Sequence, residues 1–169
     1  MPRVGELDDE CRAEAASIAA LAQDGNLTIT CAESLTSGAI ASRLGAADSA
    51  SEWFAGGIVA YSPRMKADVL GVEPGRVVTA TCSEQMARGA IRLTGAHLAV
   101  AVTGEGGPKP AEDAPVGTVF IAVRSRYTRE VRECHFDGGP AEVVAQTVLG
   151  ALRMLRNAAA EQVARDGRG

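Results

Sequence analysis

Ser34 stands where an apolar strand ends and a helix begins. Residues 27–31 alternate like a strand, and residues 39–44 have the pattern of a helix. The junction between them presents unpaired backbone N–H groups and the positive end of a helix dipole, so it can hold an anion or stabilise an oxyanion. It can also expose the Ser34 hydroxyl as a nucleophile. Capping of the helix is the alternative role for this serine.

Lys66 occupies the comparable position after the next predicted strand. Residues 56–61 predict that strand, and Ser62-Pro63 begins a short helix that contains Lys66. Turns of this kind gather at the carboxyl ends of strands in an α/β sheet, which would bring Lys66 close to Ser34. A neutral lysine can accept the serine proton, and burial or a nearby positive charge lowers its pKa to that end. The alternative is a solvated surface lysine.

A third segment of interest is the glycine-rich stretch at residues 102–108, again after a strand. Its glycines permit close approach of the backbone to a ligand. It has neither the G-x-G-x-x-G spacing of a dinucleotide site nor the Gly-Lys-Ser/Thr of a P-loop. The composition of this segment is equally compatible with a ligand-binding loop and with a flexible turn that binds nothing.

The elements that must position these turns alternate between helices and apolar strands. A first helix is predicted because Leu7, Cys11, Ile18 and Ala22 share one helical face, and further helices are predicted to begin near Thr36, at Pro63, at a capping box in residues 81–84 (ending near Thr94) and at Pro140, with a frayed tail at 165–169. Strands are predicted at residues 27–31, 56–61, 98–102, 119–123 and 130–136. Residues 47–51 and 103–115 are predicted to be loops. This order predicts one domain over residues 1–169, folded as a three-layer α/β/α sandwich. Its sheet would be mixed and mostly parallel, with residues 130–136 at an edge.

Composition and charge narrow the classes of partner. The 169 residues are 46% hydrophobic and 22% charged, with a net charge of −4 and 4% aromatic residues. A nucleic-acid partner is therefore not expected, because a basic face and stacking aromatics are lacking. No apolar run has membrane-spanning length and the acidic N-terminus lacks a signal-peptide core, so a cytoplasmic location is expected.

The cysteine and histidine residues do not suggest a metal site. Cys11, Cys31, Cys82 and Cys134 are widely spaced and are expected to be small buried residues. The two histidines, at positions 97 and 135, have no partner at ligand spacing. Neither a metal nor another cofactor is therefore predicted.

Taken together, these segments resemble the CinA C-terminal-domain family, the nicotinamide mononucleotide amidases, over about residues 27–155. That family has Ala-Glu-Ser-Cys-Thr-Gly-Gly after its first strand, Tyr-Ser-x-x-x-Lys after its second, a Val-Ser-Glu helix start and Thr-Gly-x-x-Gly-Pro after a later strand. The matching segments here are Ala32-Glu33-Ser34-Leu35-Thr36-Ser37-Gly38, Tyr61-Ser62-Pro63-Arg64-Met65-Lys66, Cys82-Ser83-Glu84 and Thr103-Gly104-Glu105-Gly106-Gly107-Pro108. Their order and spacing, rather than any one motif, carry the resemblance.

The resemblance implies a stand-alone, metal-independent amidohydrolase. It would convert nicotinamide mononucleotide, a small nucleotide substrate, to nicotinate mononucleotide and ammonia. Ser34 would be the nucleophile, Lys66 its base, and Tyr61 would assist by hydrogen bonding. Substrate would be bound by Thr36, Ser37, Gly38, Thr103, Gly104 and Gly107. The oligomeric state is left open, with a homo-oligomer as one option.

Several positions depart from the family pattern. Two family arginines near the start of the last helix are missing, and Pro140 and Val144 stand there instead. An arginine at that place could clamp a phosphate or a carboxamide oxygen. Glu105 replaces an apolar residue, and its carboxylate is expected to repel a phosphate. Leu35 and Ser37 replace Cys and Gly beside the nucleophile.

These departures leave two rival functions open: an amidase for another carboxamide, or a catalytically silent nucleotide-binding module of the same fold. Arg43, Arg64 and Lys109 are the residues that could replace the missing arginines.

Overall fold

The computed structural model describes residues 4–168. Helices and strands alternate through most of this chain, as the sequence pattern predicts. Their order is α1 (Val4–Gly25), β1 (Ile29–Glu33), α2 (Ala39–Gly45), α3 (Ala50–Trp53), β2 (Phe54–Val59), α4 (Pro63–Leu70), α5 (Ala80–Thr94), β3 (Leu98–Gly104), β4 (Thr118–Arg124), β5 (Arg129–His135) and α6 (Pro140–Asp166).

The strands form one sheet in the order β2-β1-β3-β4-β5. Strand β1 pairs in parallel with β2 and with β3. Strand β4 pairs antiparallel with β3 and with β5, so β4 alone runs against the other strands. The expected mixed, mostly parallel sheet is therefore confirmed, and β5 lies at an edge as predicted. The carboxyl ends of β1, β2 and β3 meet along one side of the sheet.

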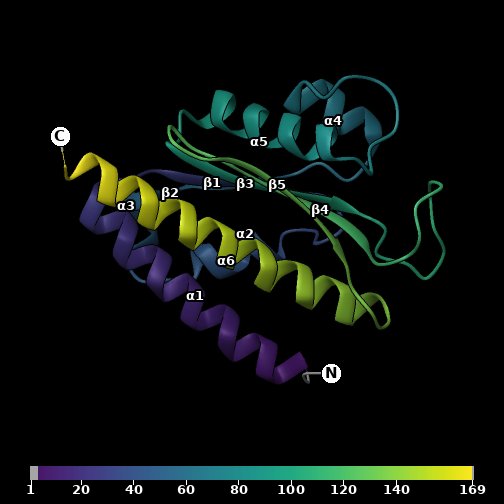
Figure 1. Cartoon of the computed structure of the whole chain (residues 1–169), viewed down its shortest axis with the longest axis horizontal. Coiled ribbons are helices and arrows are strands. Elements are labelled where there is room, and N and C mark those ends of the chain that lie inside the picture. The colour runs from purple at the N-terminus through teal and green to yellow at the C-terminus, as the bar shows by residue number, and fades with distance from the viewer. Residues whose placement is uncertain (1–3, 169) are drawn as a thin grey trace.

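Helices cover both faces of the sheet and complete the three layers (Figure 1). Helices α1, α2, α3 and α6 lie on one face, and α4 and α5 lie on the other. Strand β3 shows how the sequence fills both interfaces. Its residues Leu98, Val100 and Val102 belong to the core beneath α1 and α6, whereas Ala99 and Ala101 belong to the core beneath α5. Small side chains on the α5 face let that helix approach the sheet closely.

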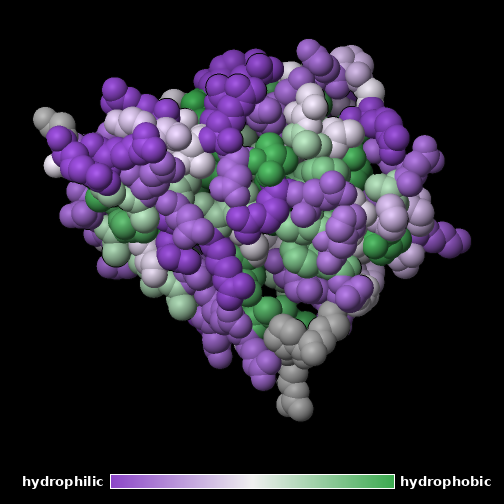
Figure 2. Space-filling view, viewed as in Figure 1, coloured by the Kyte–Doolittle hydropathy of each residue, from purple (hydrophilic) through white to green (hydrophobic). Residues whose placement is uncertain are grey.

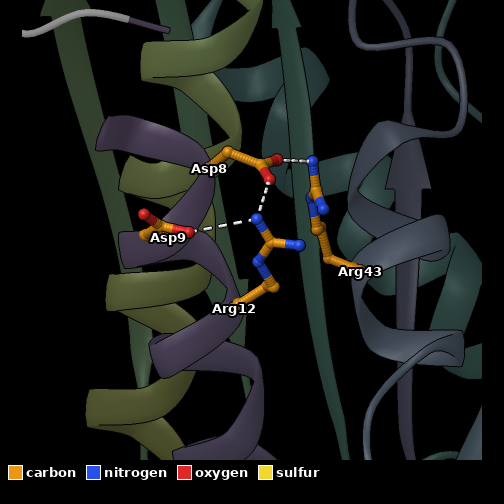
Figure 3. A network of polar contacts seen from close by, with 4 residues as sticks. All are labelled: Asp8, Asp9, Arg12 and Arg43. Carbon is orange, nitrogen blue, oxygen red and sulfur yellow. Dashed lines mark hydrogen bonds and ion pairs between the residues drawn. The ribbon is translucent and has the colours of Figure 1, made fainter. Parts of the chain in front are cut away.

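Charged residues join α1 to α2 on the outside of the first layer. Asp8 forms ion pairs with Arg12 of its own helix and with Arg43 of α2, and Arg12 also reaches Asp9 (Figure 3). The face that displays α1 and α6 is mostly hydrophilic, with hydrophobic residues confined to smaller areas (Figure 2). None of the described helices has the length and apolar character needed to cross a membrane.

Several helix and strand boundaries differ from those predicted by the hydrophobic pattern, because local hydrogen bonds favour other end points. The first strand begins at Ile29 rather than at residue 27, because Leu27 N donates to Ala22 O at the end of α1. Helix α5 is capped by Thr79, whose Oγ1 accepts from Cys82 N at 3.0 Å, and the predicted capping box at 81–84 is wrong. Helix α6 continues to Asp166, so the frayed tail predicted from 165 is wrong for residues 165 and 166; residue 169 lies outside the described residues.

Three further boundaries shift by a few residues. Strand β2 covers Phe54–Val59 instead of 56–61, and the loop expected at 47–51 gives way to α3 at Ala50. Helix α2 begins at Ala39 rather than near Thr36. The cause is a turn at positions 37 and 38, where Ser37 has a φ of 50° and Gly38 a φ of 100°. A left-handed backbone conformation cannot continue an α-helix.

Candidate active site

Three turns at the carboxyl ends of β1, β2 and β3 enclose a cavity of about 490 Å³. Ser34 follows β1, Lys66 lies in α4 after β2, and Thr103 and Gly104 end β3. This volume is in the range of sites for small ligands. Six of the predicted site residues line the cavity: Ser34, Tyr61, Lys66, Thr103, Gly104 and Gly107.

The central feature of the cavity is the contact between Ser34 and Lys66. Lys66 Nζ lies 2.8 Å from Ser34 Oγ and 2.8 Å from the carbonyl oxygen of Tyr61. Both side chains are buried: Lys66 is 1% exposed and Ser34 is 7% exposed. A hydroxyl and an amine at this distance can exchange a proton directly.

Burial also sets the protonation of this pair. Desolvation lowers the pKa of the Lys66 amine from its ordinary value, while the nearby Cys82 and Glu112 act in the opposite direction. Desolvation raises the pKa of the Cys82 thiol to about 11, so at neutral pH that thiol is protonated and carries no charge. The carboxylate of Glu112 is then the charge that favours the lysine cation.

Local sequence fixes the position of helix α4, which carries Lys66. Ser62 caps the helix by accepting from Met65 N, and Pro63 occupies its first turn. The far end of the helix packs against α5 at Gly89, where an added Cβ would lie 2.1 Å from Leu70 O. Only glycine permits that approach, so the spacing of the two helices depends on it.

Glu33 supports the serine turn, and sequence reasoning assigned it no role. Its side chain is fully buried (0% exposed) and accepts from Thr36 Oγ1 at 2.6 Å, from Ile40 N at 2.9 Å and from Ala41 N at 2.9 Å. The carboxylate therefore occupies the N-terminus of α2, where the dipole favours an anion. The sequence feature that could have indicated this role is the position of an acidic residue just before a predicted helix start.

Thr36, Ser37 and Gly38 do not line the cavity, in contrast to the six residues above. The Thr36 hydroxyl is bound to Glu33, and Ser37 is exposed. Because Glu33 already fills the N-terminus of α2, that terminus is not open to a substrate anion. The arrangement therefore gives no support to the predicted role of these three residues in binding.

Tyr61 contacts Lys66 through its backbone rather than its ring. The carbonyl oxygen accepts from the lysine amine, while the side chain is 65% exposed at the rim of the cavity. An exposed aromatic ring at a rim offers a face on which a planar or cationic ligand can stack.

The loop after β3 is held by two carboxylates that also line the cavity. Glu105, 4% exposed, accepts from Ala111 N at 2.9 Å and from Glu112 N at 2.7 Å. Glu112 in turn accepts from Val77 N and Val78 N at 2.8 and 3.0 Å. The two side chains fasten residues 105–112 to the segment before α5. Glu105 thus adds a negative charge to the wall, as expected from the sequence.

The positions of the missing family arginines also face the cavity. Pro140 and Val144, from the first turns of α6, are part of its lining. Two of the three possible replacements are engaged elsewhere, since Arg43 pairs with Asp8 (Figure 3) and Arg64 pairs with its helix neighbour Asp68. The third candidate is at the site, because Lys109 lines the cavity. Its side chain makes no hydrogen bond or ion pair within the described part of the chain.

The cysteines occupy structural positions. Cys11, Cys31 and Cys82 are buried and Cys134 is half-buried. Within residues 4–168, no cluster of three or more His, Cys, Asp or Glu side chains is arranged to hold a metal ion.

The fold and the site together define a class: an α/β protein with a buried Ser–Lys pair where adjacent parallel strands end. The chain belongs to the CinA C-terminal domain family, whose pattern it matches over residues 12–159. It is 39% identical over 145 residues to a CinA-like protein of Geotalea daltonii, an alignment that covers 82% of this chain and 35% of that protein. The chain spans about a third of the length of the curated relatives it matches.

Solved structures of the same superfamily share the fold. A CinA superfamily protein from Klebsiella pneumoniae superposes with a TM-score of 0.85 at 30% identity, covering 89% of this chain and 98% of that one. A competence/damage inducible protein from Agrobacterium tumefaciens gives a TM-score of 0.80 at 34% identity, covering 86% and 93%. These likenesses extend to the whole sandwich rather than to a single motif.

Proposed function

We propose that this protein is an amidohydrolase that converts a carboxamide to a carboxylate and ammonia. The observation that carries the proposal is the 2.8 Å contact between Ser34 Oγ and Lys66 Nζ inside a cavity of ligand size. The lowered pKa of Lys66 supports it, because only the neutral amine can accept a proton. The family resemblance makes nicotinamide mononucleotide the reference substrate.

Acylation uses Ser34 and Lys66 in turn as nucleophile and acid–base group. Ser34 Oγ attacks the carboxamide carbon, and its proton passes to Lys66 Nζ. Lys66 then gives this proton to the amide nitrogen as the C–N bond breaks, so ammonia leaves and an acyl ester remains on Ser34. The developing oxyanion needs preorganised donors. The backbone N–H groups of Gly106 and Gly107 are candidates, because they line the cavity and donate to no other group in the described chain.

Deacylation reverses the proton path. Water adds to the ester carbon as Lys66 Nζ takes one of its protons. The C–O bond to Ser34 then breaks and the proton returns from Lys66 to Ser34 Oγ. The product is released as a carboxylic acid, which gives its remaining proton to solvent and becomes the carboxylate. The carbonyl of Tyr61 keeps the lysine amine in reach of the serine throughout.

An assay of ammonia release tests the proposal. Nicotinamide mononucleotide, nicotinamide riboside, nicotinamide and unrelated carboxamides are each incubated with the protein, with Ser34→Ala purified in parallel to detect a contaminating amidase. We expect release from at least one pyridine carboxamide by the unaltered chain alone. Equal ammonia release by the unaltered chain and by Ser34→Ala contradicts the proposal. Failure of both preparations to release ammonia from any compound also contradicts it, and leaves the catalytically silent module as the alternative.

A second candidate, an amidase for a carboxamide other than nicotinamide mononucleotide, is favoured by one observation. Pro140 and Val144 line the cavity at the positions of the missing arginines. The same ammonia assay separates the two candidates by substrate.

A further inference from the structure

We infer that this cavity selects carboxamides that carry no anionic group and discriminates against a phosphorylated substrate. The inference rests on the proposed amide hydrolysis and concerns only its substrate class. It follows from the charges that surround the Ser34–Lys66 pair.

Two carboxylates form part of the cavity wall. Glu105 and Glu112 each accept two backbone N–H hydrogen bonds, at 2.7 to 3.0 Å, which suits an ionised carboxylate. These bonds hold both groups in place, so neither can swing away when an anion enters. Glu105 is nearly buried, and a charge at such a position is screened less by salt and water than an exposed one.

The positive groups of the wall do not offset these charges. Lys66 must be neutral when it accepts the serine proton, so it offers no cation in the reactive state. Lys109 is exposed, and its charge is screened by solvent. Among the described lining residues there is no arginine. The reactive cavity is therefore acidic on balance.

The two helix termini beside the cavity each lack a backbone N–H donor, because a proline lies in the first turn of both α4 and α6. Pro140 has no N–H to offer at the start of α6, and Glu142 supplies a carboxylate in its first turn. At the start of α4, Ser62 Oγ already accepts from Met65 N. A phosphate at either terminus would therefore meet fewer backbone N–H donors than a helix start usually offers, and at α6 it would also meet the Glu142 carboxylate.

The rest of the lining suits a neutral or cationic ring. Leu35, Val77, Val78 and Val144 supply apolar surface, and Tyr61 places an exposed aromatic ring at the rim. An N-alkylated pyridine carboxamide is a planar cation, which both an aromatic face and an acidic wall attract.

Two probes that differ only by a phosphate test the inference. Nicotinamide riboside and nicotinamide mononucleotide share the same carboxamide and the same cationic ring. We expect kcat/KM for the riboside to exceed that for the mononucleotide by about tenfold at low salt. This ratio corresponds to about 1.4 kcal/mol of repulsion between the phosphate and the acidic wall. Added salt should narrow the gap, because screening relieves the repulsion of the phosphate.

Substitutions at the cavity wall give matched comparisons. Val144→Arg should raise kcat/KM for the mononucleotide relative to the riboside by about tenfold, whereas the uncharged Val144→Gln should not change the ratio. Lys109→Gln should change it by less than about threefold. Thermal melting of each variant shows that its fold is retained, and the comparison on the unaltered chain needs no variant at all.

Two results would overturn the inference. A mononucleotide preference of about tenfold or more, lost in Lys109→Gln, would make Lys109 a phosphate clamp and leave the proposed hydrolysis intact. Hydrolysis of neither compound, nor of any other carboxamide in the panel, would remove the proposed function and this inference with it.

Discussion

Lys66 Nζ and Ser34 Oγ lie 2.8 Å apart although the two residues follow different strands and are 32 positions apart in the chain. The parallel pairing of β1 and β2 places their carboxyl ends side by side, and the turns after them bring the two side chains together. The contact is buried, so a charged amine there is costly and a neutral amine is favoured.

The first prediction concerns the pH dependence of the reaction. The rate should rise with pH as Lys66 loses its proton, with an inflection below the ordinary lysine value of about 10.4. Lys66→Arg should abolish this activity at every pH, because a guanidinium keeps its proton. The profile of kcat/KM checks both; activity retained by the arginine variant would contradict the base role.

The second prediction concerns stability. Burial lowers the folded-state pKa of Lys66, so between that value and the ordinary one the unfolded chain binds more protons than the folded chain. The free energy of unfolding should therefore rise with pH across this window. Urea titrations of the unaltered chain and of Lys66→Met give the difference that isolates this residue. A pH-independent difference would show that Lys66 has no shifted pKa.

The third prediction concerns Glu33. Glu33→Gln loses charge-assisted hydrogen bonds to the start of α2 and places an amide NH₂ against backbone donors, so it should cost about 3 kcal/mol of unfolding free energy. Glu130→Gln, on the exposed edge strand β5, is the matched control and should cost less than about 0.5 kcal/mol. Equal costs in urea denaturation would remove the support role from Glu33.

The fourth prediction concerns the left-handed backbone at Ser37. Its φ of 50° strains a residue with a side chain, so Ser37→Gly should stabilise the protein by about 0.5–1 kcal/mol. Ser17→Gly, an exposed site inside α1, should destabilise it by a similar amount. Thermal melting should show shifts of opposite sign, and a destabilised Ser37→Gly would refute the strain argument.

Sequence periodicity was sufficient to predict the layers of this fold and the two main residues of the candidate site. Strands that alternate or run apolar, each followed by a turn rich in small and polar residues, fix where Ser34 and Lys66 stand along the sheet. Their contact follows because β1 and β2 are neighbours. The edge position of β5 could be predicted because its polar and apolar residues alternate imperfectly and many of them are charged.

What the sequence missed depends on contacts between distant backbone and side-chain groups. Glu33 reaches amides seven and eight residues ahead, and Glu112 reaches the amides of Val77 and Val78 at sequence separations of 35 and 34. No local pattern encodes such partners. The cap of α5 was misplaced because both Thr79 and Thr81 can cap a helix, and in the structure it is Thr79 Oγ1 that accepts from Cys82 N.

The most direct test of the account is detection of an acyl group on Ser34. The protein is mixed with a pyridine carboxamide that it hydrolyses, quenched in acid during turnover, and analysed by intact mass and peptide mapping. We expect an added acyl mass on the peptide that contains Ser34, absent from Ser34→Ala and present in Ser62→Ala, which alters a serine of the same cavity. Undiminished ammonia release by a folded Ser34→Ala, or an adduct on another residue, would contradict the account.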